Sequence, residues 1–228
     1  MFQVEIFEKG GILMYPIFIC SLIAITIFFE RMFYLKSIKT KSKRFVVRLN
    51  NLVRNGNISL AISACRKSPT PISQIMLAGL MKYGLSRKEI KEAIEDSANQ
   101  EIPILEKGLS TLSTIGNITP LLGLLGTVFG MIKAFNVIAI MGVGKPEALA
   151  GGISEALLTT AFGLSIAIPT IVVFNYLTIR VDKLVRGMEM SCVDLVDLLT
   201  DQEANQEANL NKDQNQGGEI NYEISSSK

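Results

Sequence analysis

The sequence contains no histidine and no tryptophan, and three of its 228 residues are cysteine. Without histidine the chain lacks the commonest proton shuttle and metal ligand of proteins. Cys20, Cys65 and Cys192 match no metal-ligand spacing, and the last two fall in segments expected to be cytoplasmic, where disulfides are rare. No phosphate-binding loop follows a strand, and no set of nucleophile, base and acid can be assembled. We therefore expect no enzymatic activity, no cofactor and no metal.

Charge is also missing from three long stretches. Gly10–Phe29 is an uncharged run of 20 residues, and Leu109–Ile132 and Ala156–Ile179 each run for 24 residues without a charged side chain. About 20 apolar residues span the ~30 Å of hydrocarbon in a bilayer. The first run lacks a basic start and ends in two phenylalanines and a glutamate, so we favour an uncleaved span over a secretory signal peptide. The sequence predicts an all-α integral membrane protein with three transmembrane helices.

Basic residues are distributed unevenly around these spans. Residues 31–107 carry 15 basic and six acidic side chains, whereas the loop between the second and third spans has Lys145 alone near its centre. Since basic loops stay on the cytoplasmic side, we expect residues 31–107 and the C-terminus in the cytoplasm and the N-terminus in the periplasm. Basic charge beside a span is better explained by topology and anionic lipid than by nucleic acid. No nucleic-acid partner is therefore predicted.

Helical spacing organises the rest of the chain. Ser86 and Glu89 have the spacing of a capping box, and nothing beyond them obliges the helix to stop before the second span, apart from kinks at Pro103 and Pro120. The third span likewise continues as an amphipathic helix, so both are expected to extend into the cytoplasm. A tail rich in Asn, Gln, Glu and Ser follows and should be disordered and dispensable. The expected segments are a periplasmic N-terminus (1–9), a first transmembrane helix (10–29), a basic cytoplasmic loop with helices (30–108), a second transmembrane helix (109–140), a short periplasmic loop (141–153), a third transmembrane helix (154–179), a cytoplasmic helix (180–200) and the disordered tail (201–228).

Small residues form a stripe along each of the last two spans. They recur at spacings of three or four residues, which places each set on one face of a helix. In lipid, helices touch through such small-residue faces, so we expect the stripes to pack. The second span contributes Gly116, Pro120, Gly123, Thr127, Gly130 and Ala134, with Gly126 completing a Gly-x-x-x-Gly motif, and the third contributes Gly152, Ala156, Thr160, Gly163, Ala167 and Thr170.

A threonine lies in the middle of each stripe. Thr127 and Thr160 both fall near mid-membrane when counted from the ends of their spans. One interpretation is ordinary helix glue, because a threonine in a span often bonds to a backbone carbonyl. The other is a functional pair, since matched polar side chains at this depth are costly to keep. The sequence leaves both interpretations open.

Glu155 opens the third span, and an ionisable group at membrane depth is a functional candidate. The alternative places it near the outer headgroups, where it would help to cap its helix. It shares a face with Thr159 and lies about 140° around the helix from Thr160, so Glu155 and Thr160 should face different neighbours. Lys133 occupies a similar level on the second span. A Lys133–Glu155 ion pair is one option, and snorkelling of Lys133 to the interface is the interpretation that we favour.

Two segments carry one specific motif each. Ile115–Phe135 reads IGNITPLLGLLGTVFGMIKAF and contains P-x-x-G-L-x-G-T-V-x-G. Gly152–Tyr176 reads GISEALLTTAFGLSIAIPTIVVFNY and contains E-A-L-x-x-T-A-x-G-L followed by A-I-P. With the three-span order, these motifs resemble the MotA/TolQ/ExbB proton-channel family, its ExbB/TolQ branch being the nearer one. The resemblance covers residues 1 to about 200, and the tail beyond is outside the family pattern.

The resemblance implies a proton-channel (stator) subunit of a bacterial inner-membrane complex that energises TonB-dependent transport across the outer membrane. It implies a homo-oligomeric ring, usually of five subunits, around two single-span ExbD-like helices that carry an intramembrane aspartate. A TonB-like periplasm-spanning protein would be the partner that proton flow moves. The family's proton route corresponds here to Thr127 and Thr160, and its membrane glutamate corresponds to Glu155.

Physical chemistry agrees with that implication on one point. Threonine can relay a proton but cannot store one near neutral pH, and no histidine is available. A path past Thr127 and Thr160 therefore needs a titratable group from a partner, which the ExbD-like aspartate would supply. Two other hypotheses stay open: a TolQ-like envelope-maintenance or motility stator, and a non-conducting membrane scaffold in which the threonines are helix glue.

Overall fold

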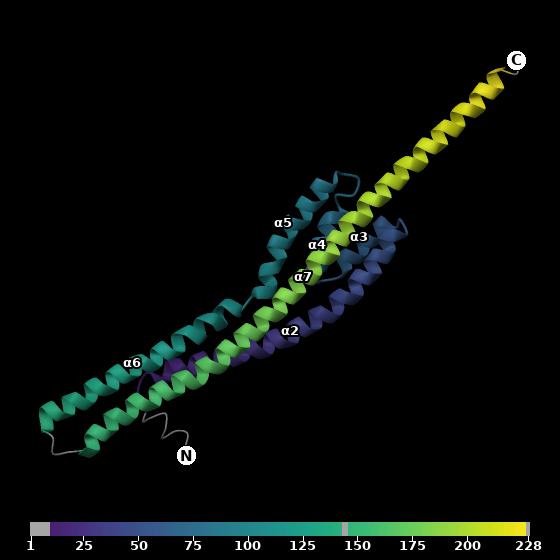
Figure 1. The fold of residues 1–228 in the computed structure, drawn as a ribbon. Helices are drawn as coiled ribbons and strands as arrows, with labels where there is room; N and C mark the ends of the chain where they lie inside the picture. Colours follow the sequence, from purple (N-terminus) through teal and green to yellow (C-terminus); the bar gives the residue numbers. More distant parts are fainter. Residues whose placement is uncertain (1–9, 143–145, 227–228) are drawn as a thin grey trace. The chain divides into compact units, whose positions relative to one another are not determined.

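The computed structural model describes residues 10–142 and 146–226, which form six helices and no β-strand (Figure 1). The expected N-terminal segment 1–9, residues 143–145 of the expected loop and residues 227–228 of the tail lie outside the described residues. The chain divides into two compact units. Unit 1 comprises Met1–Leu35 and Glu106–Val181, and unit 2 comprises Lys36–Leu105 and Asp182–Lys228. The predicted all-α class is confirmed.

Among the described residues, three helices are long and apolar enough to cross a membrane: α2 (Met14–Arg54), α6 (Leu109–Met141) and α7 (Pro146–Ser226). In the most apolar window of each helix, at most 22% of the residues are buried within the chain. Apolar patches of this extent mark surfaces that face lipid or other subunits. The predicted three-span membrane protein is therefore confirmed, and the oligomeric ring stays a prediction.

Helix α2 is longer than the sequence predicts. We expected a transmembrane helix over residues 10–29 and a basic loop with helices beyond it, whereas α2 is a single helix of 41 residues that ends at Arg54. No proline or glycine interrupts residues 17–55, and the helix stops just before Gly56, whose φ is +73°. The basic residues therefore lie on a continuous helix, because nothing in this stretch breaks one.

The connection into the second span differs from expectation in the opposite way. Helix α5 (Arg87–Glu106) ends before α6 begins at Leu109, so no single helix runs into the span. Gly108 lies between them with a φ of +81°, a left-handed conformation that glycine adopts without strain. A Cβ at this position would lie 3.1 Å from Cγ2 of Ile27. The expected continuous helix is wrong, and glycine at a tight contact, rather than Pro103 or Pro120, sets the break.

The predicted capping box at the start of α5 is confirmed. The backbone N–H of Glu89 donates to Ser86 Oγ at 3.4 Å, and the N–H of Ser86 donates to Glu89 Oε2 at 3.1 Å. The Ser86 hydroxyl also donates to Glu89 Oε2 at 2.7 Å. These side-chain and backbone hydrogen bonds stabilise the ionised carboxylate and hold the pKa of Glu89 below its ordinary value of 4.5.

This lowered pKa predicts an acid-dependent contribution to the stability of unit 2. Because the folded-state pKa lies below the unfolded one, the stabilisation is present above pH 4.5 and is lost as pH falls through the folded pKa. Glu89→Gln keeps a hydrogen-bond acceptor but has no charge to titrate, so the variant should lose less stability than wild type over that range. Thermal unfolding followed by circular dichroism between neutral pH and pH ~3 tests this. Parallel pH profiles for the two proteins would contradict it.

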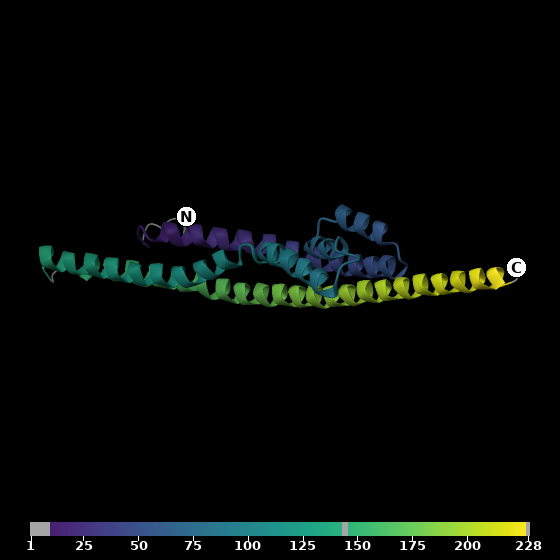
Figure 2. The same ribbon diagram turned by 90° about the horizontal axis from the view of Figure 1, so that it is seen from above.

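Unit 2 gathers short helices around the later parts of α2 and α7. Helices α3 (Ile58–Lys67) and α4 (Pro71–Leu80) pack on each other (Figure 2). Cys65 and Cys192 are buried as free thiols, and burial raises the pKa of each to about 12, so both are poor nucleophiles. The fully buried side chains of this unit include Leu49, Val53, Ile72, Ile75, Met76, Leu80, Ile90, Leu195 and Leu199.

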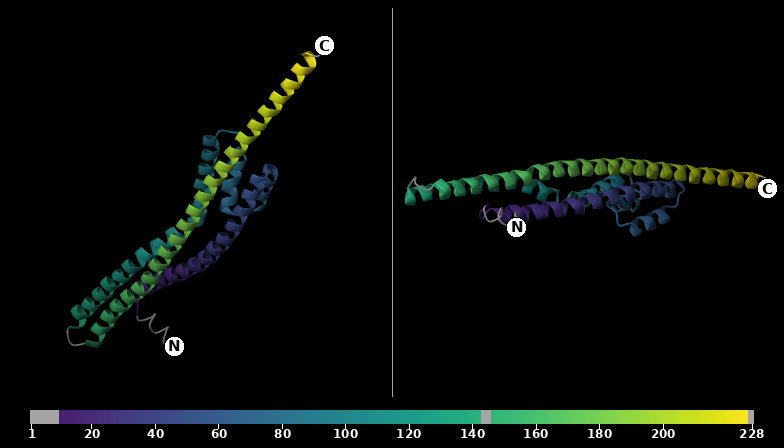
Figure 3. Two further views of the ribbon diagram at one scale, coloured as in Figure 1. Left: turned by 45° about the vertical axis from the view of Figure 1, so that its right-hand side comes forward. Right: turned by 90° about the horizontal axis from the view of Figure 1, so that it is seen from below.

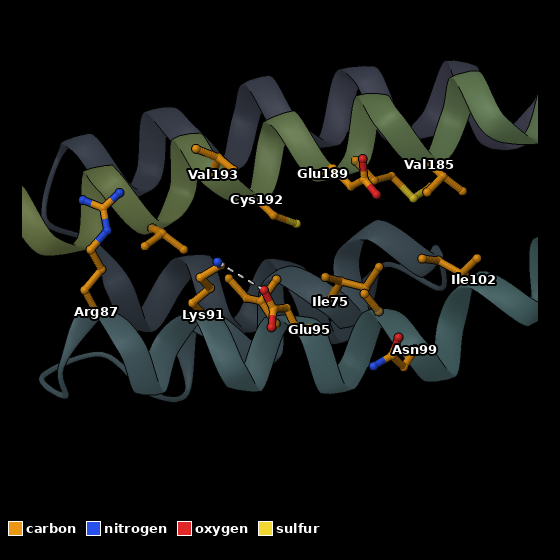
Figure 4. A pocket seen from close by; sticks show the side chains of 14 residues that line it. Ile75, Arg87, Lys91, Glu95, Asn99, Ile102, Val185, Glu189, Cys192 and Val193 are labelled. Carbon is orange, nitrogen blue, oxygen red and sulfur yellow. Dashed lines mark ion pairs between the residues drawn. The ribbon is translucent and has the colours of Figure 1, made fainter.

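A cavity of about 620 Å³ separates α5 from α7 within unit 2 (Figure 4). Its wall is mostly apolar, and Lys91 and Glu95 of α5 form an ion pair of 3.4 Å on one side. Arg87 donates to Asp197 Oδ1 at 2.6 Å and so joins the two helices at one end of the cavity. This ion pair is exposed and contributes little to stability.

Helix α7 runs from Pro146 to Ser226 and accommodates Pro169 without ending. Its helical backbone continues through the tail after Asp201 that the sequence predicts to be disordered. The tail contains no proline, and its Glu, Gln, Ala and Lys residues are compatible with a helix, so the disorder of the tail stays a prediction. In unit 1, α6 and the first part of α7 lie side by side and antiparallel (Figures 1 and 3).

Candidate functional site

The two small-residue stripes of unit 1 face each other between α6 and α7. A Cβ at Gly123 would lie 3.0 Å from the Cα of Thr160, and one at Gly163 would lie 3.1 Å from the Cα of Gly123. A Cβ at Gly126 would lie 2.5 Å from Thr159 Cβ. Both helices use glycine where the opposite backbone is closest, so a larger side chain on either would separate them.

The contact stays close toward the outer end predicted for the spans. A Cβ at Gly130 would lie 2.7 Å from the carbonyl oxygen of Gly152, and a Cβ at Gly152 would lie 2.8 Å from that of Gly130. Ala134 and Ala156 are buried beside them. At the other end, Gly116 faces Ile171, and a Cβ there would lie 2.8 Å from Ile171 Cγ1. The remaining predicted packing residues are Pro120, which is half-buried, and Ala167, which is 1% exposed.

Thr160 lies in the middle of this contact and bonds across it. Its hydroxyl donates to the carbonyl oxygen of Gly123 on α6 at 2.9 Å. The side chain is half-buried, so the lone pairs of its hydroxyl oxygen can accept a further hydrogen bond. Thr160 is thus the threonine that links the two spans, and its hydroxyl is placed to take part in a hydrogen-bonded chain.

Thr127 is placed differently. Its hydroxyl donates to the carbonyl oxygen of Leu124, one turn earlier on its own helix, at 2.6 Å. This is the intrahelical bond typical of threonine in a span. Its side chain is half-buried at the same packed face. In the described part of the chain the two threonine hydroxyls therefore have separate acceptors, and a direct link between them would require a water molecule or a partner side chain.

Glu155 forms an ion pair, which differs from the snorkelling that we favoured for Lys133. Nζ of Lys133 donates to Glu155 Oε2 at 2.7 Å, joining α6 to α7. The Glu155 side chain is 19% exposed, whereas that of Lys133 is 67% exposed. The lysine pairs rather than extending away because the largely enclosed carboxylate lies within its reach.

The backbone preceding α2 completes this end of the site. Gly11 has a φ of +71°, and a Cβ on it would overlap Glu155 Oε1. The carboxyl group is therefore held between Lys133 on one side and a glycine backbone on the other. The sequence could indicate the glutamate, because it is a carboxylate in an apolar run. No sequence pattern indicates that Gly10 and Gly11, more than 140 residues away, cover it.

Thr159 is a site residue that we did not predict. It is 1% exposed, and its hydroxyl donates to the carbonyl oxygen of Glu155 at 2.5 Å and to that of Gly10 at 3.4 Å. It therefore connects the Glu155 backbone with the segment before α2. Its position four residues after Glu155 was the available signal, since such residues share one helix face.

The site contributes hydroxyl groups, one carboxylate and the ammonium group of Lys133. Among the described residues, no group of three His, Cys, Asp or Glu side chains could hold a metal ion. Hydroxyls accept and donate hydrogen bonds without changing charge, whereas Glu155 can bind and release a proton. The arrangement can relay protons.

Comparison with known proteins agrees with this chemistry. Residues 67–190, more than half of the chain, match the family described as the MotA/TolQ/ExbB proton channel family. The chain belongs to this proton-channel family. The matched segment contains all of α6 and the membrane part of α7, including Thr127, Glu155 and Thr160.

Relatives named ExbB and relatives named TolQ are both similar to this chain. A protein named ExbB-like 3 from Synechocystis is 31% identical over 73% of this chain and 80% of its own. The biopolymer transport protein exbB1 of Vibrio cholerae is 31% identical over 80% of this chain and 82% of its own. The Tol-Pal system protein TolQ of Haemophilus influenzae is 37% identical over 42% of each chain. These names place the chain in the ExbB/TolQ branch of a transport family of multi-pass membrane proteins.

Proposed function

We propose that this protein is the proton-channel stator subunit of an inner-membrane complex that uses the proton motive force to energise TonB-dependent transport across the outer membrane. The observation that carries the proposal is the hydroxyl of Thr160, bonded to Gly123 at the centre of the glycine contact. A scaffold needs the glycines but not a hydroxyl there. In a proton-channel family, a hydroxyl that spans two helices is suited to pass a proton along a hydrogen-bonded chain.

Thr127, Thr160 and Glu155 form this chain's part of the proposed path. The threonines solvate and relay the proton, and Glu155 at the other end of the contact exchanges it, while an acidic group from a partner supplies the mid-membrane station. The driving force is ample, because moving one charge across 100 mV releases ~2.3 kcal/mol. Because the partner supplies the mid-membrane acidic group, this subunit alone should conduct protons poorly.

The relatives' names and the exposed spans support a set of partners for this chain. We propose a homo-oligomeric ring, five subunits being the family number, around an ExbD-like single-span subunit with an intramembrane aspartate. A TonB-like periplasm-spanning protein would be moved by the ring. The basic 31–107 segment supports a cytoplasmic position for unit 2 and the C-terminus and a periplasmic one for the N-terminus, by the positive-inside rule. The apolar faces of α2, α6 and α7 supply the surface for lipid and for neighbouring subunits.

A TolQ-like role in envelope maintenance is the second candidate, and the similarity to TolQ of Haemophilus influenzae favours it. Deletion of the gene separates the two candidates. Loss of energised uptake of iron complexes or vitamins supports the first, and envelope leakage with detergent sensitivity supports the second. A neighbouring gene for a single-span protein with an intramembrane aspartate is expected in both cases.

Proton flux through reconstituted complex is the direct test. Vesicles that contain this protein and its single-span partner should acidify under an imposed potential, as reported by a trapped pH-sensitive dye. Vesicles with this protein alone should do so at a much lower rate. If the complete complex carries no flux above empty vesicles, the channel function is wrong and a non-conducting scaffold becomes the better explanation.

The Lys133–Glu155 ion pair allows structure and conduction to be separated. Lys133→Gln should lower stability by ~1 kcal/mol or less, since Lys133 is largely exposed. It should lower proton flux as much as Glu155→Gln does, and the two changes together should be no worse than either alone. The swapped variant, Lys133→Glu with Glu155→Lys, should regain the melting temperature of wild type but not its flux. Full flux in the swapped variant would show that the pair is purely structural.

A further inference from the structure

A second pocket of unit 2 combines three lysines with a buried hydroxyl. It has a volume of about 290 Å³ and lies between α2 and α7, with Ile72 of α4 in its wall. Lys39 and Lys43 of α2 and Lys183 of α7 line it, and the described residues around it include no carboxylate. The positive charge of the pocket is therefore not balanced within its own wall.

Ser42 gives the pocket a polar interior. The residue is 8% exposed and lines the pocket, and its Oγ is buried without a hydrogen-bond partner among the described residues. By contrast, Ser191 on the opposite wall donates to the carbonyl oxygen of Gly187 at 2.9 Å. Buried hydroxyls are nearly always paired, so Ser42 is an unused donor that a ligand oxygen would satisfy.

The lysines point to an anionic ligand. Lys39 and Lys43 are one helical turn apart on α2, where two like charges destabilise a helix unless an anion lies between them. In the described part of the chain these two and Lys183 form no ion pair, whereas two lysines of α5 pair with glutamates one turn away. A phosphate group offers several acceptor oxygens and a negative charge, which suits ammonium groups and a hydroxyl.

The depth of the pocket along its helices indicates where such a phosphate comes from. Lys183 follows Ile179, the end of the third uncharged run, by about 6 Å of helix, and Lys39 follows Phe29, the end of the first run, by about 15 Å, at 1.5 Å per residue. Bilayer headgroups occupy roughly the first 5–8 Å beyond the hydrocarbon, so Lys183 lies at headgroup depth. The other pocket residues form an apolar wall against which a glycerol backbone or acyl chain could pack: Val46, Val47, Ile72, Leu184 and Met188.

We propose that this pocket binds a phosphate group, with its oxygens held by Lys39, Lys43, Lys183 and the hydroxyl of Ser42. An anionic phospholipid carries the group together with an apolar part that matches the wall, and a soluble phosphate compound shares the same headgroup chemistry. The site does not depend on proton conduction, so it can be tested independently of the proposed function.

Native mass spectrometry of the full-length protein in detergent, titrated with phosphatidylglycerol, tests the proposal. The pocket variant Lys39→Gln/Lys43→Gln/Lys183→Gln should bind the lipid about a hundredfold more weakly, at about fivefold for each lysine. The matched control is Lys41→Gln/Arg44→Gln/Arg186→Gln. It removes three charges from the same stretches of α2 and α7, outside the pocket, and should change binding by less than about twofold because those charges do not touch the ligand.

Ser42→Ala retains every charge and should also weaken binding, by about tenfold, because it removes the buried donor. Equal loss in the pocket variant and its control would overturn the proposal, since general surface charge would then explain binding. Unchanged binding in both the pocket variant and Ser42→Ala would overturn it as well. A final arm uses inorganic phosphate with the protein in a maltoside detergent that contains no phosphate. Binding of phosphate that depends on the pocket lysines supports the site with a soluble ligand, and its absence beside tight phosphatidylglycerol binding supports the lipid.

Discussion

Thr160→Val is expected to abolish proton flux through the assembled complex while leaving the complex intact. Valine has nearly the shape of threonine, so the α6–α7 contact is kept and just the hydroxyl that donates to Gly123 at 2.9 Å is lost. Interhelical hydrogen bonds in membranes contribute about 0.6 kcal/mol on average, so stability should fall by at most ~1–2 kcal/mol. Flux should fall by on the order of 10²-fold or more, because a relay with a missing hydroxyl cannot pass the proton on.

The matched control for this experiment is Thr170→Val on the same helix. Thr170 is more buried than Thr160, at 6% exposed, and its hydroxyl donates to the carbonyl oxygen of Ile166 within α7 at 2.7 Å. It should lose a similar amount of stability without losing flux. Thr160→Ser, which restores a hydroxyl, should recover conduction. Wild-type flux in Thr160→Val would mean that the Thr160 hydroxyl only joins the two helices, and it would favour the scaffold hypothesis.

The second large effect is expected from a single methyl group at Gly152. A Cβ there would lie 2.8 Å from the carbonyl oxygen of Gly130 and 2.9 Å from Ala134 Cβ, so Gly152→Ala must force α6 and α7 apart. Overpacking of this kind typically costs ~1–3 kcal/mol, and here it also shifts the Thr160 contact two turns away. Reduced melting temperature and weakened assembly of the purified complex are the expected results.

Gly151→Ala is the control for that change. Gly151 precedes Gly152 on the same helix turn, and a Cβ at Gly151 meets nothing within 4 Å. Alanine improves helix propensity by up to about 1 kcal/mol at either position, so this term cancels when the two variants are compared. Gly152→Ala should therefore be clearly less stable than Gly151→Ala. Equal melting temperatures for the two variants would mean that α6 and α7 do not pack this closely in the membrane.

Much of the fold could be predicted because its signals are local. A run of 24 uncharged residues indicates a membrane span without reference to the rest of the chain. The capping box of Ser86 and Glu89 depends on four consecutive residues. The stripes were visible as a period, which fixes which residues share a face. The sequence could not fix which neighbour that face meets, and the structure supplies this by placing Gly123 against Thr160.

The missed features depend on contacts between distant residues. The break at Gly108 reflects a left-handed backbone packed near Ile27, some 80 residues away, and no pattern around position 108 encodes that neighbour. Snorkelling of Lys133 was favoured because a lone lysine near an interface is the common case. The ion pair prevails because α7 brings Glu155 within 2.7 Å of it.

The glycine pair before α2 limits how freely the first span can be exchanged. The family match begins at residue 67, so the first span could be regarded as an interchangeable anchor. Yet Gly10 accepts a hydrogen bond from Thr159, and Gly11 leaves no space for a side chain beside Glu155. A chimaera that takes its first span from a relative would have to bring glycine at the position of Gly11. The first span and the Lys133–Glu155 end of the site must therefore be exchanged together.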